Sequence, residues 1–387
     1  MNRDEQDTDG CDKIALLPSA PSLQPIVCCQ FGATTSPPRL HRYYLNRADI
    51  LFSRTFALVY SLLLFFFATL THATPSIAPS SSTPIFVLNS LNANVSIIDP
   101  VTFEEIRRVP TGKEPHHIYL SPDSKSVMVA NAASDSITFL DPLTGQVQRT
   151  MTGIVDPYHL RFSPDMKWFV TAANRLDHID IYRWEGAGDQ FKLNLVKRIP
   201  AGKTPSHIAI DSKSKIAYVT LQDSNELIAI DLATQTPMWT IPVGKMPADL
   251  FLTPDDKTLL IGLTGESDVQ VLDVSGPKPV EIKRIKTGKG AHAFRAQGDG
   301  KHVFVSNRTA NTISRIDLGS LAVVDVFKAS SGPDCMEMLA DGKTLLVTTR
   351  WTGTLTFIDI ETKAVTRNVK VGKSPHGVWT LNHAPRQ

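Results

Sequence analysis

The sequence has few cysteines and almost no net charge, and each shortage excludes a class of protein. Of its four cysteines, three (Cys11, Cys28 and Cys29) lie near the N-terminus, which leaves Cys335 as the one thiol downstream. A fold held by internal disulfides is therefore excluded for most of the chain. The 40 lysines and arginines nearly balance the 38 aspartates and glutamates, and no basic run occurs. Nucleic-acid binding is accordingly not expected.

Two kinds of chemical motif are also missing. No Cys-x-x-Cys-His sequence occurs, so no covalently attached c-type haem is expected. No recognisable serine, cysteine or metal hydrolase motif occurs either. Apolar residues make up 42% of the chain, which is enough for a sizeable core, and 387 residues allow one large β domain or two domains.

The N-terminal region carries the one long apolar run. Residues 56–70 read FALVYSLLLFFFATL, with arginines before them and the small-residue stretch Thr71-His72-Ala73 after them. This layout predicts a signal peptide over residues 51–73 and an exported protein, periplasmic or secreted, with no stable membrane span after cleavage. An uncleaved anchor is the alternative. We expect residues 1–50 to be a non-native or disordered extension and residues 74–83 to be a linker.

A proline followed closely by histidine recurs through the rest of the chain at intervals of 42 to 48 residues. The repeated positions, which we call anchors, are Pro115, Pro157, Pro205, Pro247, Ala291, Pro333 and Pro375. Self-similarity at this period indicates stacked units of supersecondary structure.

Each unit contains four short β runs separated by turn residues. In the unit that begins at Pro115, Ser121-Pro122-Asp123 marks the first turn, and the third run ends at Asp141. Equivalent aspartates follow the third run at positions 99, 231, 273, 317 and 359, where we expect them to accept hydrogen bonds from the next turn. Four antiparallel strands per unit, repeated radially, predict a β-propeller.

The two ends of the repeat region complete each other. Three β runs precede the first anchor and one follows the last, so the C-terminal strand should pair with the N-terminal three. The prediction is an all-β, seven-bladed propeller over residues 84–382, with its ring closed by this pairing and a tail at 383–387.

Several short motifs resemble those of a known family. Phe86-Val87-Leu88-Asn89, Phe304-Val305-Ser306-Asn307 and the Gly-Lys-x-Pro leads are similar to the repeats of YVTN-type propellers. The resemblance implies a secreted propeller but is compatible with many functions. Residues 372–379 distantly resemble the haem d1-binding propellers of nitrite reductase and its maturation proteins. Those haem d1 domains are similar to eight-bladed rings, whereas seven blades are expected here.

The first strand of each blade should border the central channel, where its side chains alternate in direction. Residues two and four past the anchor are then expected on the channel wall, and residues one past the anchor in a loop at the rim. The candidate ligand-binding residues are His116, His117, His159, His207, His292, His376, Arg161, Arg295, Asp249 and Cys335. The metal candidates among them are His117, His159 and His207, on three consecutive blades.

Three functions use these residues differently. The first is an exported binding or scaffold protein with a small ligand or a protein partner at the His-lined channel mouth. The alternative is a redox-linked protein that binds a transition metal or a tetrapyrrole there, although the sequence requires no cofactor. A lactonase-like hydrolase is the third. Each histidine could instead belong to the structural consensus of the repeat. A monomer is expected.

Overall fold

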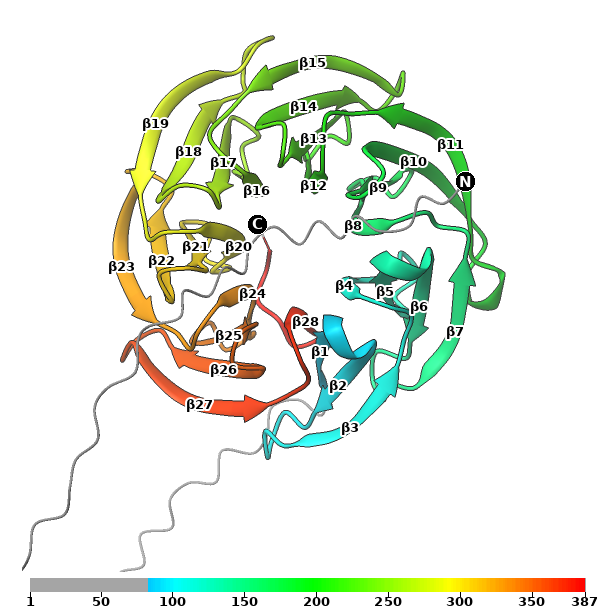
Figure 1. Ribbon diagram of the computed structural model, residues 1–387, viewed down its shortest axis with the longest axis vertical. Helices are drawn as coiled ribbons and strands as arrows, with labels where there is room; N and C mark the ends of the chain where they lie inside the picture. The colour runs from blue at the N-terminus through cyan, green and yellow to red at the C-terminus, as the bar shows by residue number, and fades with distance from the viewer. Residues whose placement is uncertain (1–82, 387) are drawn as a thin grey trace, which may run out of the picture. The chain divides into compact units, whose positions relative to one another are not determined.

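The computed structural model describes residues 83–386, which form one ring of seven four-stranded antiparallel sheets (Figure 1). In every sheet the strands follow one another from the axis outward, except that β28 comes before β1 in the sheet β28-β1-β2-β3. This pairing confirms both the predicted seven-bladed propeller and the predicted closure of its ring. The predicted extension, signal peptide and most of the linker lie outside the described residues.

The four strands of each blade occupy equivalent positions around the ring. The innermost strands are β4 (Pro115–Leu120), β8 (Pro157–Phe162), β12 (Pro205–Ile210), β16 (Pro247–Leu252), β20 (Ala291–Ala296), β24 (Pro333–Met338) and β28 (Pro375–Thr380). The second strands are β1 (Ile85–Asn89), β5 (Val127–Asn131), β9 (Phe169–Ala173), β13 (Ile216–Leu221), β17 (Thr258–Leu263), β21 (His302–Asn307) and β25 (Thr344–Thr349).

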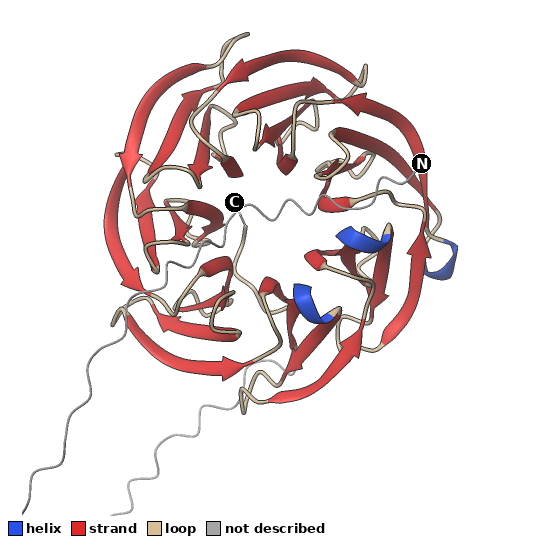
Figure 2. Ribbon diagram, in the orientation of Figure 1, coloured by secondary structure: helices blue, strands red, loops and turns tan. Residues whose placement is uncertain are grey.

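The third strands are β2 (Asn94–Ile98), β6 (Ser136–Leu140), β10 (His178–Glu185), β14 (Glu226–Asp231), β18 (Asp268–Asp273), β22 (Thr312–Asp317) and β26 (Thr354–Asp359). The outermost strands are β3 (Glu105–Pro110), β7 (Val147–Thr152), β11 (Lys192–Pro200), β15 (Thr236–Pro242), β19 (Val280–Lys286), β23 (Ala322–Lys328) and β27 (Ala364–Lys370). Figure 2 shows that helix is limited, within residues 83–386, to the short η1 (Ser90–Asn92), η2 (Ala132–Ser134) and η3 (Gly188–Gln190).

The turns after the third strands form as their chemistry predicts. Asp99 accepts backbone N–H bonds from Val101 and Thr102 at 2.7 and 2.9 Å. The other five aspartates of this type, at positions 141, 231, 273, 317 and 359, accept the same kind of bond. These side chains satisfy backbone donors that the tight turn leaves unpaired.

The apolar core is divided among the interfaces between blades. Each of seven buried clusters draws its side chains mainly from two neighbouring blades. Val170 of β9 and Val219 of β13, for example, belong to one cluster. At the closing blade, Trp379 of β28 lies with Phe86 and Val127 in another, with a distance of 5.6 Å between the ring centroids of Trp379 and Phe86. Burial of these faces holds the innermost strands around the axis.

We expect Trp379→Ala to weaken the closing interface most directly. Trp379 is only 1% exposed, so its truncation leaves a cavity in the cluster that joins the closing blade to the next. The free energy of unfolding should fall by about 3–5 kcal/mol in chemical denaturation. Trp351→Ala is the matched control, because Trp351 is 58% exposed and its loss should cost about 0.5 kcal/mol or less. Equal losses for the two variants would contradict this account of closure.

Candidate functional site

A β-bulge at the start of each innermost strand brings two consecutive side chains to the axis. In β4, Pro115 pairs with Asn131 and Ile118 with Val129, so His116 and His117 together oppose a single residue of β5. The same register shift occurs in the other six innermost strands. Such a bulge interrupts the alternation of side chains and redirects them.

The bulge corrects one expectation about the residues that follow the anchors. His116, His292 and His376 do not lie in rim loops; they lie within β4, β20 and β28. All three are at most 3% exposed. Alternation predicted a single inward residue here, but the extra residue allows the first and second positions after the anchor to be buried together.

All six candidate histidines meet at the axis. The ring centroids of His116 and His376 are 3.6 Å apart, and those of His117 and His159 are 4.3 Å apart. His207 lies 4.9 Å from His159 and 5.6 Å from His292. His117 also contacts His207, although their blades are not adjacent, at a centroid distance of 5.2 Å. Contacts between non-adjacent blades place these rings at the centre of the propeller. We call these six side chains the histidine cluster.

Every ring of the histidine cluster has one buried nitrogen without a hydrogen-bond partner among the described residues. These atoms are His116 Nδ1, His117 Nε2, His159 Nδ1, His207 Nε2, His292 Nδ1 and His376 Nε2. The last two face Asp334 Oδ1 within ion-pair distance, at 3.0 and 3.7 Å. In His376, Nδ1 donates to the carbonyl oxygen of His116 at 2.8 Å, which leaves the lone pair on Nε2. In His207, Nδ1 lies 2.9 Å from Ser206 Oγ, with the same consequence if the ring donates. Such contacts fix the orientation of an imidazole and the nitrogen that it presents.

His292 differs from the other five. Arg308 Nη2 donates to His292 Nε2 at 2.7 Å, and His292 Nδ1 lies 3.0 Å from Asp334 Oδ1. Both ring nitrogens therefore already face partners. We assign His292 to the support of Asp334 rather than to the direct binding of a ligand.

Asp334 is the buried anion beside the cluster. Arg308 Nη2 lies 2.7 Å from its Oδ1, and Arg350 Nη1 lies 3.5 Å from its Oδ2. Burial opposes ionisation of this side chain, but Arg308 and the nearby histidines outweigh that effect and hold the pKa of Asp334 well below its usual value. Asp334 is consequently a carboxylate at neutral pH.

The imidazoles themselves are neutral at neutral pH. Burial is the main cause that lowers the pKa of each ring of the cluster, and the proximity of other rings or of arginines adds to it. The pKa falls to about 4 for His292 and about 3 for His376. Neutral imidazole is the form that binds metal ions.

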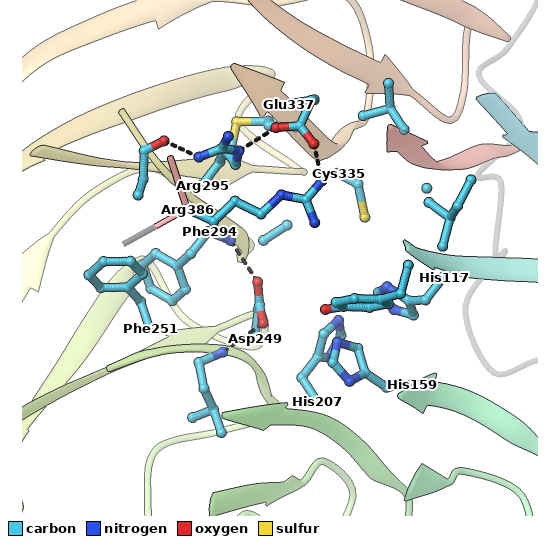
Figure 3. A pocket seen from close by; sticks show the side chains of 18 of the residues that line it. His117, His159, His207, Asp249, Phe251, Phe294, Arg295, Cys335, Glu337 and Arg386 are labelled. Atoms are coloured by element: carbon cyan, nitrogen blue, oxygen red, sulfur yellow. Dashed lines mark hydrogen bonds and ion pairs between the residues drawn. The ribbon is translucent and has the colours of Figure 1, made fainter. Parts of the chain in front are cut away.

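A cavity of about 130 Å³ lies against one side of the cluster (Figure 3). His117, His159 and His207 line one side of it, and Arg295, Glu337 and Arg386 lie across from them. His116, His292 and His376 do not belong to its lining. The three histidines predicted as metal candidates are thus the ones that reach the open space.

The predicted polar residues Asp249, Arg161 and Cys335 also line this cavity. Both oxygens of Asp249 accept backbone N–H bonds, from Leu250 at 2.9 Å and Phe294 at 2.8 Å, and burial raises the pKa of Asp249 to about 6. Cys335 Sγ lies 3.5 Å from His376 Nδ1, and burial raises the pKa of this thiol well above its usual value. Cys335 therefore carries its proton at neutral pH.

The C-terminal residues close one side of the cavity. Arg295 donates to the carbonyl oxygens of Ala384 and Pro385 at 2.7 and 2.9 Å. Its Nε also donates to Glu337 at 2.6 Å, and Arg386 donates to the second oxygen of Glu337. The residues expected as a simple tail beyond the propeller thus contribute to the wall of the cavity.

The sequence interpretation missed Arg308, Arg350 and Arg386. The first two had a detectable signal, because Arg308 and Arg350 each follow the last residue of a second strand. Arg175 lies one position further along its own unit and pairs with Asp156 at 2.9 Å. Arg386 lies outside the repeat, so its place at the cavity had no counterpart from which to infer it.

Comparison with known proteins now gives the family. A family model described as YNCE-like beta-propeller matches residues 56–386. The chain belongs to the YNCE-like β-propeller family. This agrees with the resemblance to YVTN-type repeats. None of the curated proteins compared matches the sequence significantly.

Solved structures that this propeller resembles have diverse functions. Dihydro-heme d1 dehydrogenase NirN, in complex with DHE, is 17% identical over 80% of this chain and 78% of its own, with a TM-score of 0.59. The periplasmic gluconolactonase PpgL of Pseudomonas aeruginosa is 16% identical over 79% of this chain and 99% of its own, with a TM-score of 0.66.

A functionally unknown protein from Desulfotomaculum acetoxidans is 16% identical and also has a TM-score of 0.66, over 77% of this chain and 98% of its own. At these identities the likeness extends to the fold alone.

We expect the metal-free protein to lose stability steeply as the pH falls below about 6.5. Below that pH the histidines of the unfolded chain bind protons, whereas the buried imidazoles of the folded protein stay neutral. The free energy of unfolding therefore decreases as the pH falls, until the pH reaches the folded-state pKa of each ring, which is about 4 for His292 and about 3 for His376. Each histidine contributes ~1.4 kcal/mol per pH unit in this window. Asp249, whose pKa is raised to about 6, has the opposite effect on the free energy of unfolding, but it is a single group against six histidines.

Urea denaturation at several pH values, with EDTA present, measures this slope. His376→Asn keeps a donor for the His116 carbonyl but removes one titrating ring, so the slope should decrease by ~1.4 kcal/mol per pH unit. Trp351→Ala removes no titrating group and should leave the slope unchanged. A stability that does not depend on pH between 4 and 6.5 would contradict the burial of neutral imidazoles.

Proposed function

We propose that this propeller binds a transition-metal ion at its axis, with His117, His159 and His207 as the primary ligands. One atom from each of these side chains lies within 4.8 Å of the others, a separation that small adjustments bring to a coordination sphere. Imidazole nitrogens suit zinc, copper, iron and nickel. Three protein ligands facing a cavity leave a coordination position free for water or a ligand, as in catalytic metal sites.

The observation that carries this proposal is the group of buried nitrogens without partners. A buried polar atom that lacks a hydrogen bond costs about 1–3 kcal/mol, and among the described residues four ring nitrogens with neither a hydrogen bond nor an ion-pair partner gather within this cluster, on His116, His117, His159 and His207. Native proteins rarely leave such atoms unsatisfied without a reason. A metal ion accepts several imidazole lone pairs at one point, and neutral imidazole is the commonest metal ligand in proteins.

The surroundings of the three ligands support the same proposal. The rings are neutral, so they do not repel a cation. Asp334, which is ionised, lies next to the cluster and offsets part of the positive charge of Arg308 and Arg350 there. His116 and His376 form a second close group with His117, away from the cavity, and supply further nitrogens there. A binding or scaffold role alone would leave these features without an explanation.

A haem d1 group, as the resemblance to NirN suggests, does not fit this arrangement. The imidazole rings are packed at centroid distances of 3.6–4.9 Å, which leaves no slot for a macrocycle between them. The adjoining cavity of about 130 Å³ is also well below the roughly 300–1,000 Å³ of typical cofactor pockets. We therefore favour a bare ion over a tetrapyrrole.

A lactonase activity, as the name of the similar PpgL suggests, has little support from the carboxylates of the cavity. Both oxygens of Asp249 accept backbone N–H bonds. Glu337 is held between Arg295 and Arg386. Both carboxylates are thus already engaged by protein donors.

Export, inferred from the predicted signal peptide at 51–73, remains part of the proposal, and the N-terminal sequence of the protein recovered from culture medium or periplasm tests it.

The metal proposal is tested on the full chain after treatment with EDTA and dialysis. Titration with Co²⁺, Zn²⁺ and Cu²⁺ should give tight binding of at least one ion per chain, a Co²⁺ absorption spectrum in the visible range, and an increase in melting temperature that grows with metal concentration. His117→Gln, His159→Asn and His207→Gln should each weaken binding by about 100-fold or more, beyond the 10–100-fold typical of supporting residues.

His302→Gln is the matched control, because His302 lies on β21 with its Nδ1 2.6 Å from Asp299 and outside the cluster. This variant should bind metal like the parent protein. If no ion binds with micromolar or better affinity, or if the control loses as much affinity as the three ligand variants, the proposal is wrong and the histidines belong to the structure of the repeat.

A further inference from the structure

The cavity beside the histidine cluster is lined by more arginines than carboxylates. Arg161, Arg295 and Arg386 line it together with the carboxylates Asp249 and Glu337. Glu337 is shared between Arg295 and Arg386, which leaves the two arginines with one carboxylate. A divalent ion on three neutral imidazoles would add two further positive charges.

Arg161 is the arginine free to meet a ligand. Its Nε donates to the carbonyl oxygen of Ile208 at 3.1 Å, and its guanidinium carbon lies 4.9 Å from the centre of the Tyr119 ring. These two contacts fix the plane of the guanidinium. Unlike Arg295 and Arg386, Arg161 forms no ion pair within residues 83–386. A planar guanidinium held in this way suits two-point binding of an oxyanion.

Arg161 also lines the boundary between the inner cavity and a second, outer cavity. The outer cavity, of about 420 Å³, is lined by Phe162, Leu252 and Pro385, and it shares Arg161, Leu250, Phe251 and Arg386 with the inner one. An anion that enters through the outer cavity therefore meets Arg161 and Arg386 before it reaches the imidazoles. Positive charge at an entrance of low dielectric attracts anions.

We infer that the inner cavity binds a small oxyanion, of the size of formate, between the guanidinium of Arg161 and the open coordination position of the metal. This inference rests on the proposed metal site and names its ligand class. The volume of about 130 Å³ sets the size limit, because it is less than half the lower end of the roughly 300–1,000 Å³ pockets that hold drug-sized ligands. The inner cavity should therefore exclude anions as large as 2-naphthoate.

The test uses the full chain loaded with Co²⁺ and titrated with sodium formate. Formate that binds at the open position should shift the visible Co²⁺ absorption in a saturable manner, whereas sodium 2-naphthoate, a bulky monocarboxylate that does not chelate Co²⁺, should neither cause this shift nor compete with formate. Arg161→Met should weaken formate binding by about 10- to 100-fold while the affinity for Co²⁺ stays the same. Arg161→Lys retains the charge but not the planar fork, so its affinity for formate should lie between those of the parent protein and Arg161→Met.

Arg183→Met is the matched control, because Arg183 also stacks on an aromatic ring, with its guanidinium carbon 4.0 Å from the centre of the Trp168 ring, but does not line the cavity. It should bind formate like the parent protein. If Co²⁺ binds but formate causes no shift, or if Arg161→Met binds formate unchanged, the inference is wrong while the metal site stands. If 2-naphthoate binds as well as formate, the size limit is wrong. If no Co²⁺ spectrum forms at all, the proposed function itself fails.

Discussion

Pairing of β28 with β1 is the constraint on which the rest of the propeller depends. It joins residues more than 280 positions apart in sequence, as the bond from Gly372 N to Asn89 Oδ1 illustrates. It also places His376 next to His116, whose carbonyl oxygen accepts a hydrogen bond from the His376 ring. Gly377 makes this approach possible, because a Cβ at that position would lie 2.9 Å from the same oxygen. The geometry at the axis therefore depends on the closure of the ring.

The sequence predicted the fold well because the fold is periodic. Anchors such as Pro115 and Pro375, the aspartates that end the third strands and the unequal ends of the repeat region were enough for seven blades and their closure. Each of these signals is local and occurs several times, so that one irregular unit, such as the one with Ala291, does not obscure the period.

The candidate site was predictable only in part. Alternation along a strand correctly selected His117, His159 and His207 for the cavity, but it misplaced His116 and His376, because the bulge inserts one residue into each innermost strand. A bulge changes the direction of side chains, but no distinctive residue marks it in this sequence, so it could not be predicted. Arg386 shows a second limit, since a side chain outside the repeat reaches the cavity through tertiary contacts alone.

The division of the apolar core among seven interfaces has a consequence for any ion held at the axis. Each blade packs against both of its neighbours through buried apolar clusters. His117, His159 and His207 therefore come from three strands whose relative positions are fixed by this packing. A coordination sphere built on such a frame is preorganised: its geometry is set by the ring and changes little when the ion is exchanged or changes oxidation state. Selectivity would then come from the shape that the ring imposes, because imidazole alone distinguishes poorly among late transition metals.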